Sequence, residues 1–311
     1  MQLALTLNTH EERDLIFAQQ VGVDYVVGEP DAWDLAGLRA MHNRVDKAGL
    51  KLVGIETLPA ALYAHAVLGE AGRDAEIAAI QQIVRDMGAA GIGAISYRWA
   101  PPSVERTSFA PLGRGGARVQ GYDPELVARG VQSPPCVSAE ALWANLAYLL
   151  DAVLPVAEGA GVRLAGRPDS PPLAKVAGVP RILVDVPALK RFLDLAPSPS
   201  HGLDLDVGAV ALMPDADMLE VMRYVARRKR LVMVRLGNVQ RVGGGFRECF
   251  LDEGVVSMPR VLQTLREVGY AGPVRAAAPP VVEGDSEWGH KGRAHDIGYV
   301  KALWQVVEQL P

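Results

Sequence analysis

The sequence predicts a single-domain α/β protein that folds as a closed (β/α)8 barrel, the TIM-barrel architecture, over residues 1–311. Eight short apolar or β-branched runs alternate with eight longer segments of helical periodicity, an order typical of parallel βαβ units. No linker or change of composition divides the chain, so the eight cycles leave no residues for a second domain. We therefore expect the sheet to close on itself.

Each predicted strand is a run of five or six residues dominated by Val, Leu, Ile or Ala, and each is followed by a segment with helical spacing of its apolar residues. In chain order, we expect strands at 2–7, 24–28, 51–56, 93–98, 161–166, 202–206, 231–236 and 273–277. The helices that follow them are expected at 11–20, 33–48, 73–90, 138–159, 187–195, 216–228, 257–268 and 294–309.

The long connections follow the carboxyl ends of predicted strands, at 100–135, 167–181, 237–256 and 278–293. In barrels of this kind the active site lies at that end. The first connection is rich in Gly, Pro, Arg and Ser, which indicates either a lid over the site or an arm that contacts another subunit.

Composition excludes several classes of partner. The formal net charge of -4 argues against a nucleic-acid-binding surface. No run approaches about 20 apolar residues and no secretory signal opens the chain, so we expect no membrane partner. The two cysteines, Cys136 and Cys249, form no CxxC pair, which favours a reducing compartment, the cytoplasm, and no disulfide.

Motifs along nearly the whole chain closely resemble those of mannonate dehydratases. The carboxyl-terminal third contains VRLGNV, GGGFRECFLDEG, SMPRVLQTLREVGYAGPVR and GRAHDIGYVKALW, at 234–239, 243–254, 257–275 and 292–304. Upstream, matching motifs occur in the same order: VGIETLP, GRPDSPP, GVPRI and SPSHGLDLDVG, at 53–59, 166–172, 178–182 and 198–208.

The resemblance implies removal of water from a hexonic acid to give a 2-keto-3-deoxy acid, with a divalent metal, commonly manganese. A proton next to a carboxylate is weakly acidic, so a Lewis acid stabilises the growing enolate charge while a base removes the proton. The family holds its metal with His, Cys, His and Asp side chains from four strand ends.

At those four positions this chain has Arg167, Asp206, Arg235 and Ala277. The neighbouring proline and histidine of the family's last motif are also replaced, by Ala276 and Ala278. Arginine offers no lone pair and alanine offers no ligand atom. Asp206 can bind a hard cation, but one carboxylate does not make a metal site. We therefore expect no metal cofactor and loss of ordinary mannonate dehydration.

Three interpretations of the replacements remain open. Arg167, Asp206 and Arg235 either form a salt-bridge cluster that fills the metal position, or the two arginines bind a substrate carboxylate and supply the electrostatic role of the metal, or the changes are chance divergence. Glu56 matches a glutamate of the family and is a candidate base or a counter-ion for the arginines.

Other candidate site residues follow from their positions. Glu248 matches an acidic position of the family and either binds substrate hydroxyls or braces its loop. Arg98 and Trp99 end the fourth strand, where an arginine can meet an acid and an indole can stack on a sugar face. Asn238 and Arg275 retain family residues beside the lost ligands.

The last candidates lie in the final long connection. Trp288 aligns near the active-site tyrosine of the family, and His290 is either a new acid or base or a surface residue.

Two functions from different classes follow. The first is a metal-independent lyase or isomerase, dehydratase-like, acting on a small carboxylated polyol or related organic acid. The second is a non-catalytic barrel that binds a sugar acid or regulates a partner. Both imply a small anionic ligand, and the family resemblance implies a homo-oligomer.

Overall fold

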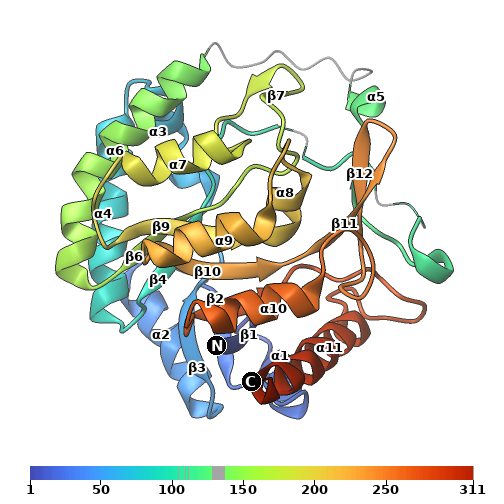
Figure 1. Cartoon of the computed structure of the whole chain (residues 1–311). Helices are drawn as coiled ribbons and strands as arrows, with labels where there is room; N and C mark the ends of the chain where they lie inside the picture. The colour runs from blue at the N-terminus through green and yellow to red at the C-terminus, as the bar shows by residue number, and fades with distance from the viewer. Residues whose placement is uncertain (104, 109, 111, 128–136, 311) are drawn as a thin grey trace.

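The computed structural model describes residues 1–103, 105–108, 110, 112–127 and 137–310. Its centre is a closed barrel of eight parallel strands, as the sequence predicted, in the order β1, β2, β3, β4, β6, β9, β10 and β13, with β13 pairing back onto β1 (Figure 1). The strands are β1 (Gln2–Asn8), β2 (Tyr25–Glu29), β3 (Lys51–Ile55), β4 (Ala94–Tyr97), β6 (Arg163–Gly166), β9 (His201–Asp206), β10 (Leu231–Leu236) and β13 (Pro273–Ala276).

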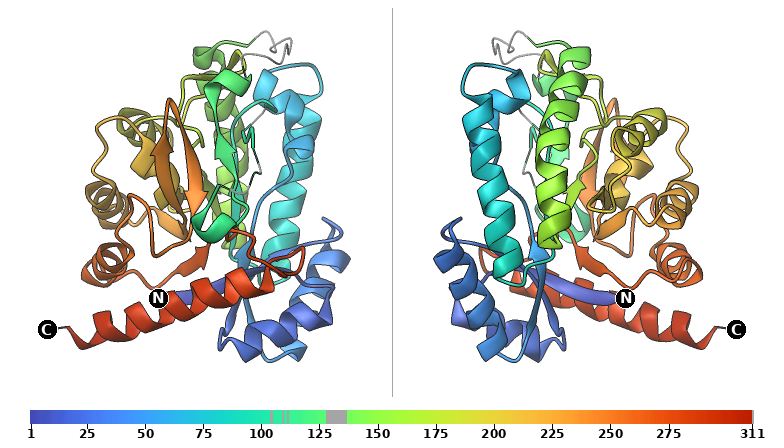
Figure 2. Two further views of the ribbon diagram at one scale, coloured as in Figure 1. Left: turned by 90° about the vertical axis from the view of Figure 1, so that its right-hand side faces the viewer. Right: turned by 90° about the vertical axis from the view of Figure 1, so that its left-hand side faces the viewer.

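A helix follows each barrel strand and covers its outer face (Figure 2). Asp34, Ser138, Asp185 and Asp217 begin four of these helices by accepting a hydrogen bond from a backbone N–H of the first turn. The covering helices are α1 (Glu12–Gln20), α2 (Leu35–Lys47), α4 (Arg73–Ala89), α6 (Ala139–Ala160), α7 (Val186–Asp194), α9 (Met218–Arg227), α10 (Met258–Glu267) and α11 (His290–Gln309).

The eight predicted strands and helices agree with these bounds to within a few residues. The largest difference is at α11, which begins at His290 rather than at 294. The Asp285 carboxylate accepts hydrogen bonds from the backbone N–H groups of Lys291 and Gly292, which extends the helix toward its amino end.

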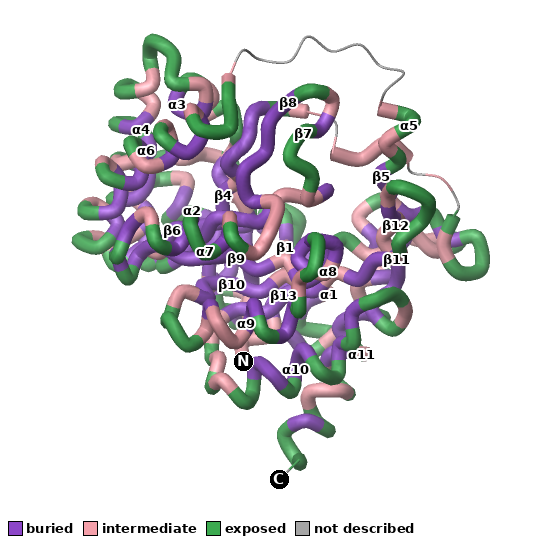
Figure 3. Tube along the Cα trace, turned by 45° about the horizontal axis from the view of Figure 1, so that its top comes forward, coloured by how far each residue is buried: buried purple, intermediate pink, exposed green. Residues whose placement is uncertain are grey.

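The buried residues form one large cluster between the outer faces of the strands and the helices, while the solvent-facing sides of the helices are exposed (Figure 3). Among the described residues, α6 is long and apolar enough to cross a membrane by composition. It packs here against α4 and α3 (Ala64–Leu68), and a covered barrel helix passes the same test.

The long connections carry elements that were not predicted. After β10, β11 (Asn238–Val242) and β12 (Gly245–Cys249) form an antiparallel hairpin whose second strand pairs with β5 (Gly121–Tyr122). The connection at 100–135 thus supplies one strand of a small sheet beside the barrel mouth (Figure 1). The remaining short elements are η1 (Ala60–Leu62), η2 (Arg114–Gly116), α5 (Pro124–Val127), β7 (Lys175–Val176), β8 (Val179–Pro180) and α8 (Val207–Leu212).

Parts of that connection, residues 104, 109, 111 and 128–135, lie outside the described residues, as does Cys136. The described parts reach across the mouth: the Arg118 backbone pairs with that of Val281 in the connection after β13.

Candidate active site

Charged side chains from several strand ends meet inside the carboxyl end of the barrel. Glu56, which follows β3, lies among three of them. Its carboxylate accepts hydrogen bonds from Arg235 Nη1 at 2.6 Å and from Arg275 Nε at 2.6 Å. Arg167 Nη2 donates to the same carboxylate at 3.1 Å, and also to the Glu56 backbone carbonyl.

Asp204, inside β9, is the second carboxylate of this group and has no solvent exposure. Arg275 donates to it from Nη1 and Nη2 at 2.9 and 2.7 Å, and Arg167 Nε donates at 3.0 Å. The Ser96 hydroxyl of β4 adds a hydrogen bond of 2.8 Å. Asp204 and Asp206 are two residues apart on one strand, so they face the same side of β9. We call the following set the arginine–carboxylate cluster: Glu56, Arg167, Asp204, Asp206, Arg235 and Arg275.

The pairing fixes the protonation of the inner carboxylates. Burial raises the pKa of Glu56, but Arg275, Arg235 and Arg167 outweigh it and lower that pKa to about 2. The same balance of burial against Arg275 and Arg167 lowers the pKa of Asp204. Glu56 is therefore ionised and a weak base, so its contacts place it as the counter-ion of the arginines.

Arg235 and Asp206 are the outer members of the cluster. The Asp206 Oδ1 accepts from the backbone N–H of Ala209 and thereby caps α8, while its Oδ2 lies 3.5 Å from Arg235 Nε. The Arg235 side chain is 21% exposed, compared with 5% for Arg167 and 0% for Arg275. Its Nη2 has no hydrogen-bond partner in the described part of the chain. Arg235 is thus the arginine of the cluster that faces the mouth.

A pocket of about 40 Å³ lies beside Arg235. Small-molecule sites usually have volumes of about 300–1,000 Å³. A sugar acid therefore enters this pocket only if side chains or the overlying connections move. Its charged lining residues are Arg98, Arg106, Asp206, Arg235, Glu248 and Asp296.

Two residues of α11 also lie near Arg235. Burial raises the pKa of Asp296 to about 6, against the lowering effect of a 3.2 Å hydrogen bond with His295. Burial and the charge of Arg235 lower the pKa of Arg293 to about 10. The Arg293 guanidinium lies over the Trp288 ring at 4.2 Å and donates from Nε to the Trp288 carbonyl. Asp296 lines the pocket and changes protonation near neutral pH.

Three predicted substrate-binding residues are buried, and the assignment is corrected for Arg275 and Trp99, which lie outside the lining of the pocket beside Arg235, whereas Asn238 belongs to that lining. Arg275 has no exposure because Glu56 and Asp204 enclose it. Trp99 is 2% exposed, and its indole N–H donates to the Leu142 carbonyl of α6. Asn238 is also 2% exposed. Its amide group makes hydrogen bonds to the backbone at Leu251, Val256 and its neighbour Val239, so it holds the loop after β12 in place.

Arg98 and Glu248 do line the pocket, each with an ionic partner. Arg98 pairs with Glu105 of the long connection. Glu248 accepts from Arg106 Nε and Nη2 at 2.9 and 2.7 Å, which ties β12 to that connection. Glu248 thus braces its loop in this structure.

His290 and Trp288 pack at the start of α11 against α1. The ring of His290 lies 4.9 Å from that of Phe17, and its Nε2 lies 3.3 Å from an Asp14 carboxylate oxygen. The indole of Trp288 meets the same Phe17 ring at 5.6 Å. Neither residue belongs to the pocket lining beside Arg235, so the prediction that His290 is an acid or base there is not supported by its position.

Sequence reasoning missed Asp204, Ser96, Arg293 and Asp296. Only Asp204 had a usable signal, because it faces the same side of β9 as Asp206. It stays a prediction that the family's four ligand positions correspond to Arg167, Asp206, Arg235 and Ala277. The described residues contain no group of three or more His, Cys, Asp or Glu side chains placed to hold a metal ion.

Comparison with known proteins gives a consistent picture. The family model described as D-mannonate dehydratase (UxuA) matches residues 14–133 and 130–310. A mannonate dehydratase from Streptococcus equi subsp. zooepidemicus is 30% identical over 90% of this chain and 82% of its own length. The crystal structure of mannonate dehydratase from Streptococcus suis superimposes with a TM-score of 0.88 at 26% identity, covering 99% of this chain and 94% of that one. An L-ribulose 3-epimerase structure, at 16% identity and a TM-score of 0.66, shares the fold over 99% of this chain and 95% of its own.

Proposed function

We propose, on the premise that this chain belongs to the D-mannonate dehydratase family, that it is a lyase acting on a small sugar acid in which arginine side chains take the place of a divalent metal. The observation that carries this proposal is the partly exposed guanidinium of Arg235, held at the mouth by Glu56.

The donor set supports a metal-free site. Guanidinium groups have no lone pair for a cation, and the positive charges of Arg167 and Arg235 repel one. The two inner carboxylates, Glu56 and Asp204, already accept hydrogen bonds from three arginines between them. A divalent ion would have to displace those arginines before it reached an oxygen of Glu56 or Asp204.

The same groups suit an anionic substrate. A carboxylate that meets Arg235 finds the free Nη2 and a guanidinium already oriented by Glu56 and Asp206. Negative charge that develops on that carboxylate, when the neighbouring C–H bond breaks, is stabilised by the same fixed donors.

Asp296 is the candidate for proton transfer. In a dehydration, a base takes the proton next to the carboxylate and the hydroxyl on the adjacent carbon leaves as water after protonation. The resulting enol then becomes the 2-keto-3-deoxy acid. A carboxyl group with a pKa of about 6 can accept the first proton and return it to the leaving hydroxyl.

The test is a dehydration assay on purified protein. Aldonic and uronic acids are supplied with and without a chelator, and 2-keto-3-deoxy product is measured beside the metal content of the protein. We expect turnover that chelation does not change. Arg235→Ala should abolish it and Arg39→Ala, at an exposed position on α2, should not. Stoichiometric bound manganese with chelator-sensitive turnover would contradict the proposal.

A second candidate function is binding without catalysis. It is favoured by the low pKa of Glu56 and by the pocket of about 40 Å³. This alternative predicts a melting-temperature increase with sugar acids that depends on Arg235, together with no product from any acid in the same assay.

A further inference from the structure

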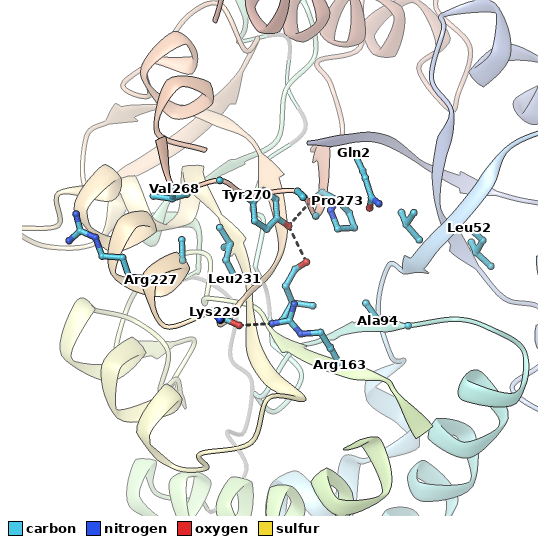
Figure 4. A pocket seen from close by; sticks show the side chains of 17 residues that line it. Gln2, Leu52, Ala94, Arg163, Arg227, Lys229, Leu231, Val268, Tyr270 and Pro273 are labelled. Atoms are coloured by element: carbon cyan, nitrogen blue, oxygen red, sulfur yellow. Dashed lines mark hydrogen bonds between the residues drawn. The ribbon is translucent and has the colours of Figure 1, made fainter. Parts of the chain in front are cut away.

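A large cavity lies at the amino ends of the barrel strands, opposite the arginine–carboxylate cluster, and Figure 4 shows the side chains that line it. It has a volume of about 700 Å³ and is lined by the first residues of several strands, including Gln2, Ala94, Arg163 and Pro273. This volume lies within the range of about 300–1,000 Å³ that small-molecule sites occupy.

Small side chains at the strand beginnings account for the space. Ala94 and Val232 line the cavity, and with Ala165 and Met233 they form a buried cluster separate from the main core. Glycines stand at Gly93 on the wall and at 272 just before β13. These small residues leave room beside the larger side chains of the lining.

The wall of the cavity is rigid. Tyr270 reaches between two strands, and its hydroxyl lies 3.0 Å from the carbonyl oxygens of both Val232 and Pro273 (Figure 4). Tyr270 is partly buried, and burial raises the pKa of its hydroxyl, so the hydroxyl remains a neutral donor. A wall held in this way does not collapse into the space.

The guanidinium of Arg163 lines this cavity and has no carboxylate partner among the described residues. Its Nη2 donates to the Lys229 carbonyl at 2.8 Å, and its Nε and Nη1 have no hydrogen-bond partner among the described residues. The lining contains three cationic side chains, Arg163, Arg227 and Lys229, and no Asp or Glu. Burial lowers the pKa of Arg163, and the nearby Arg230 lowers it further against an opposing effect of Tyr270. A half-buried guanidinium with no carboxylate partner is costly, and a bound anion relieves that cost.

We propose that this cavity is a second binding site, which holds a small organic or inorganic anion through the guanidinium of Arg163. The ligand carries one carboxylate or phosphate group, because the Nε–H and Nη1–H groups of Arg163 can each donate a charge-assisted hydrogen bond to an anionic oxygen. The Gln2 side chain lines the same cavity and offers an amide for a neighbouring polar group. The site is independent of the function proposed for the mouth.

Titration calorimetry on the full chain tests the site, with inorganic phosphate and D-gluconate as separate anionic probes and sorbitol as the uncharged control. We expect at least one anion to bind and sorbitol not to bind. Arg163→Gln should weaken that binding by about tenfold or more, since an anion loses a charge-assisted hydrogen bond. If only one of the two anions binds, that result shows whether the site prefers a phosphate or a carboxylate group. Either result supports the proposal.

Three further variants keep the result interpretable. Arg39→Gln removes a charge at an exposed position on α2, outside the lining of the cavity, so binding should be unchanged. Arg235→Ala removes the mouth arginine and should also leave this binding intact. Arg163→Lys keeps the charge and should retain binding within a few-fold, with a melting temperature that shows a folded chain. Absence of binding by both anions, or binding to the Arg235→Ala chain that survives the further change Arg163→Gln, overturns the proposal.

Discussion

The two ends of the barrel are filled by different kinds of side chain and leave different volumes of open space. At the carboxyl end, three arginines and three carboxylates fill the interior, and about 40 Å³ remains open. At the amino end, alanines and glycines line a cavity of about 700 Å³ into which one arginine projects without an acidic partner. The difference shows that paired charges can serve as core, whereas the half-buried Arg163 lies beside open space with no acidic partner among the described residues.

The largest effect on stability should come from replacing Arg275, the most buried arginine of the cluster at the carboxyl end. Arg275→Leu leaves Asp204 and Glu56 without their closest partner. The free energy of unfolding should fall by about 3–5 kcal/mol, as when one partner of a buried pair is removed. Urea unfolding followed by circular dichroism measures it. The double variant Arg275→Leu with Asp204→Leu restores the charge balance and should recover part of the loss. A single-variant loss below about 1 kcal/mol would mean that the cluster does not act as core.

The same end should be sensitive to acid. The pKa of Glu56 is about 2 in the folded chain and about 4.5 when it is unfolded, so its pairing contributes stability above pH 4.5 that is lost as the pH falls toward 2. By linkage the contribution is about 3 kcal/mol. Stability measured from pH 7 to pH 2 should show this decline, and Glu56→Gln should flatten it between pH 4.5 and 2. An unchanged slope in that variant would show that other groups carry the acid dependence.

A smaller effect is expected where the carboxyl end meets the long connection. Arg106 and Glu248 are each about one-fifth exposed, at 17% and 23%, and share two hydrogen bonds. A double-mutant cycle with Arg106→Ala and Glu248→Ala should give a coupling energy of about 1 kcal/mol. A coupling energy near zero would show that the Arg106–Glu248 pair does not stabilise the contact between the long connection and the barrel mouth.

The smallest effect is expected at the amino end. Ala94→Val adds two methyl groups in the lining of the cavity, where space is open, so stability should change by less than about 1 kcal/mol in either direction. Anion binding there should weaken because the volume shrinks. A large destabilisation would indicate that the surroundings of Ala94 are already tightly packed.

The sequence predicted the barrel because hydrophobic periodicity is a local property of each strand and helix. The run at 231–236 agrees with β10 to the residue. The hairpin of β11 and β12 was missed, because its strands carry exposed Arg and Gly residues and pair mainly with each other. Its turn passes through Gly243 at a φ of 55°, a conformation that the composition of a loop does not reveal.

The site was predicted in outline only. Arg167, Asp206 and Arg235 were expected to meet at a common centre, and they do so. The carboxylates that pair with these arginines were not predicted. The sequence does not show how deep in the barrel each acidic side chain lies, and this depth decides which of them reaches an arginine. Asp204 therefore went unnoticed while Arg275 and Trp99, both buried, were assigned to substrate. Asp296 was missed because its raised pKa comes from burial, which α11 creates only in the folded chain.

The equal number of positive and negative groups in the arginine–carboxylate cluster has a kinetic consequence. Beyond a few ångströms, opposite charges in close contact behave as a multipole whose potential declines faster than that of a single ion, and salt at physiological strength screens the rest within about 8 Å. The cluster therefore does not draw ions from bulk solution. An anion meets the Arg235 guanidinium only on contact, so its rate of encounter with the mouth should vary little with ionic strength.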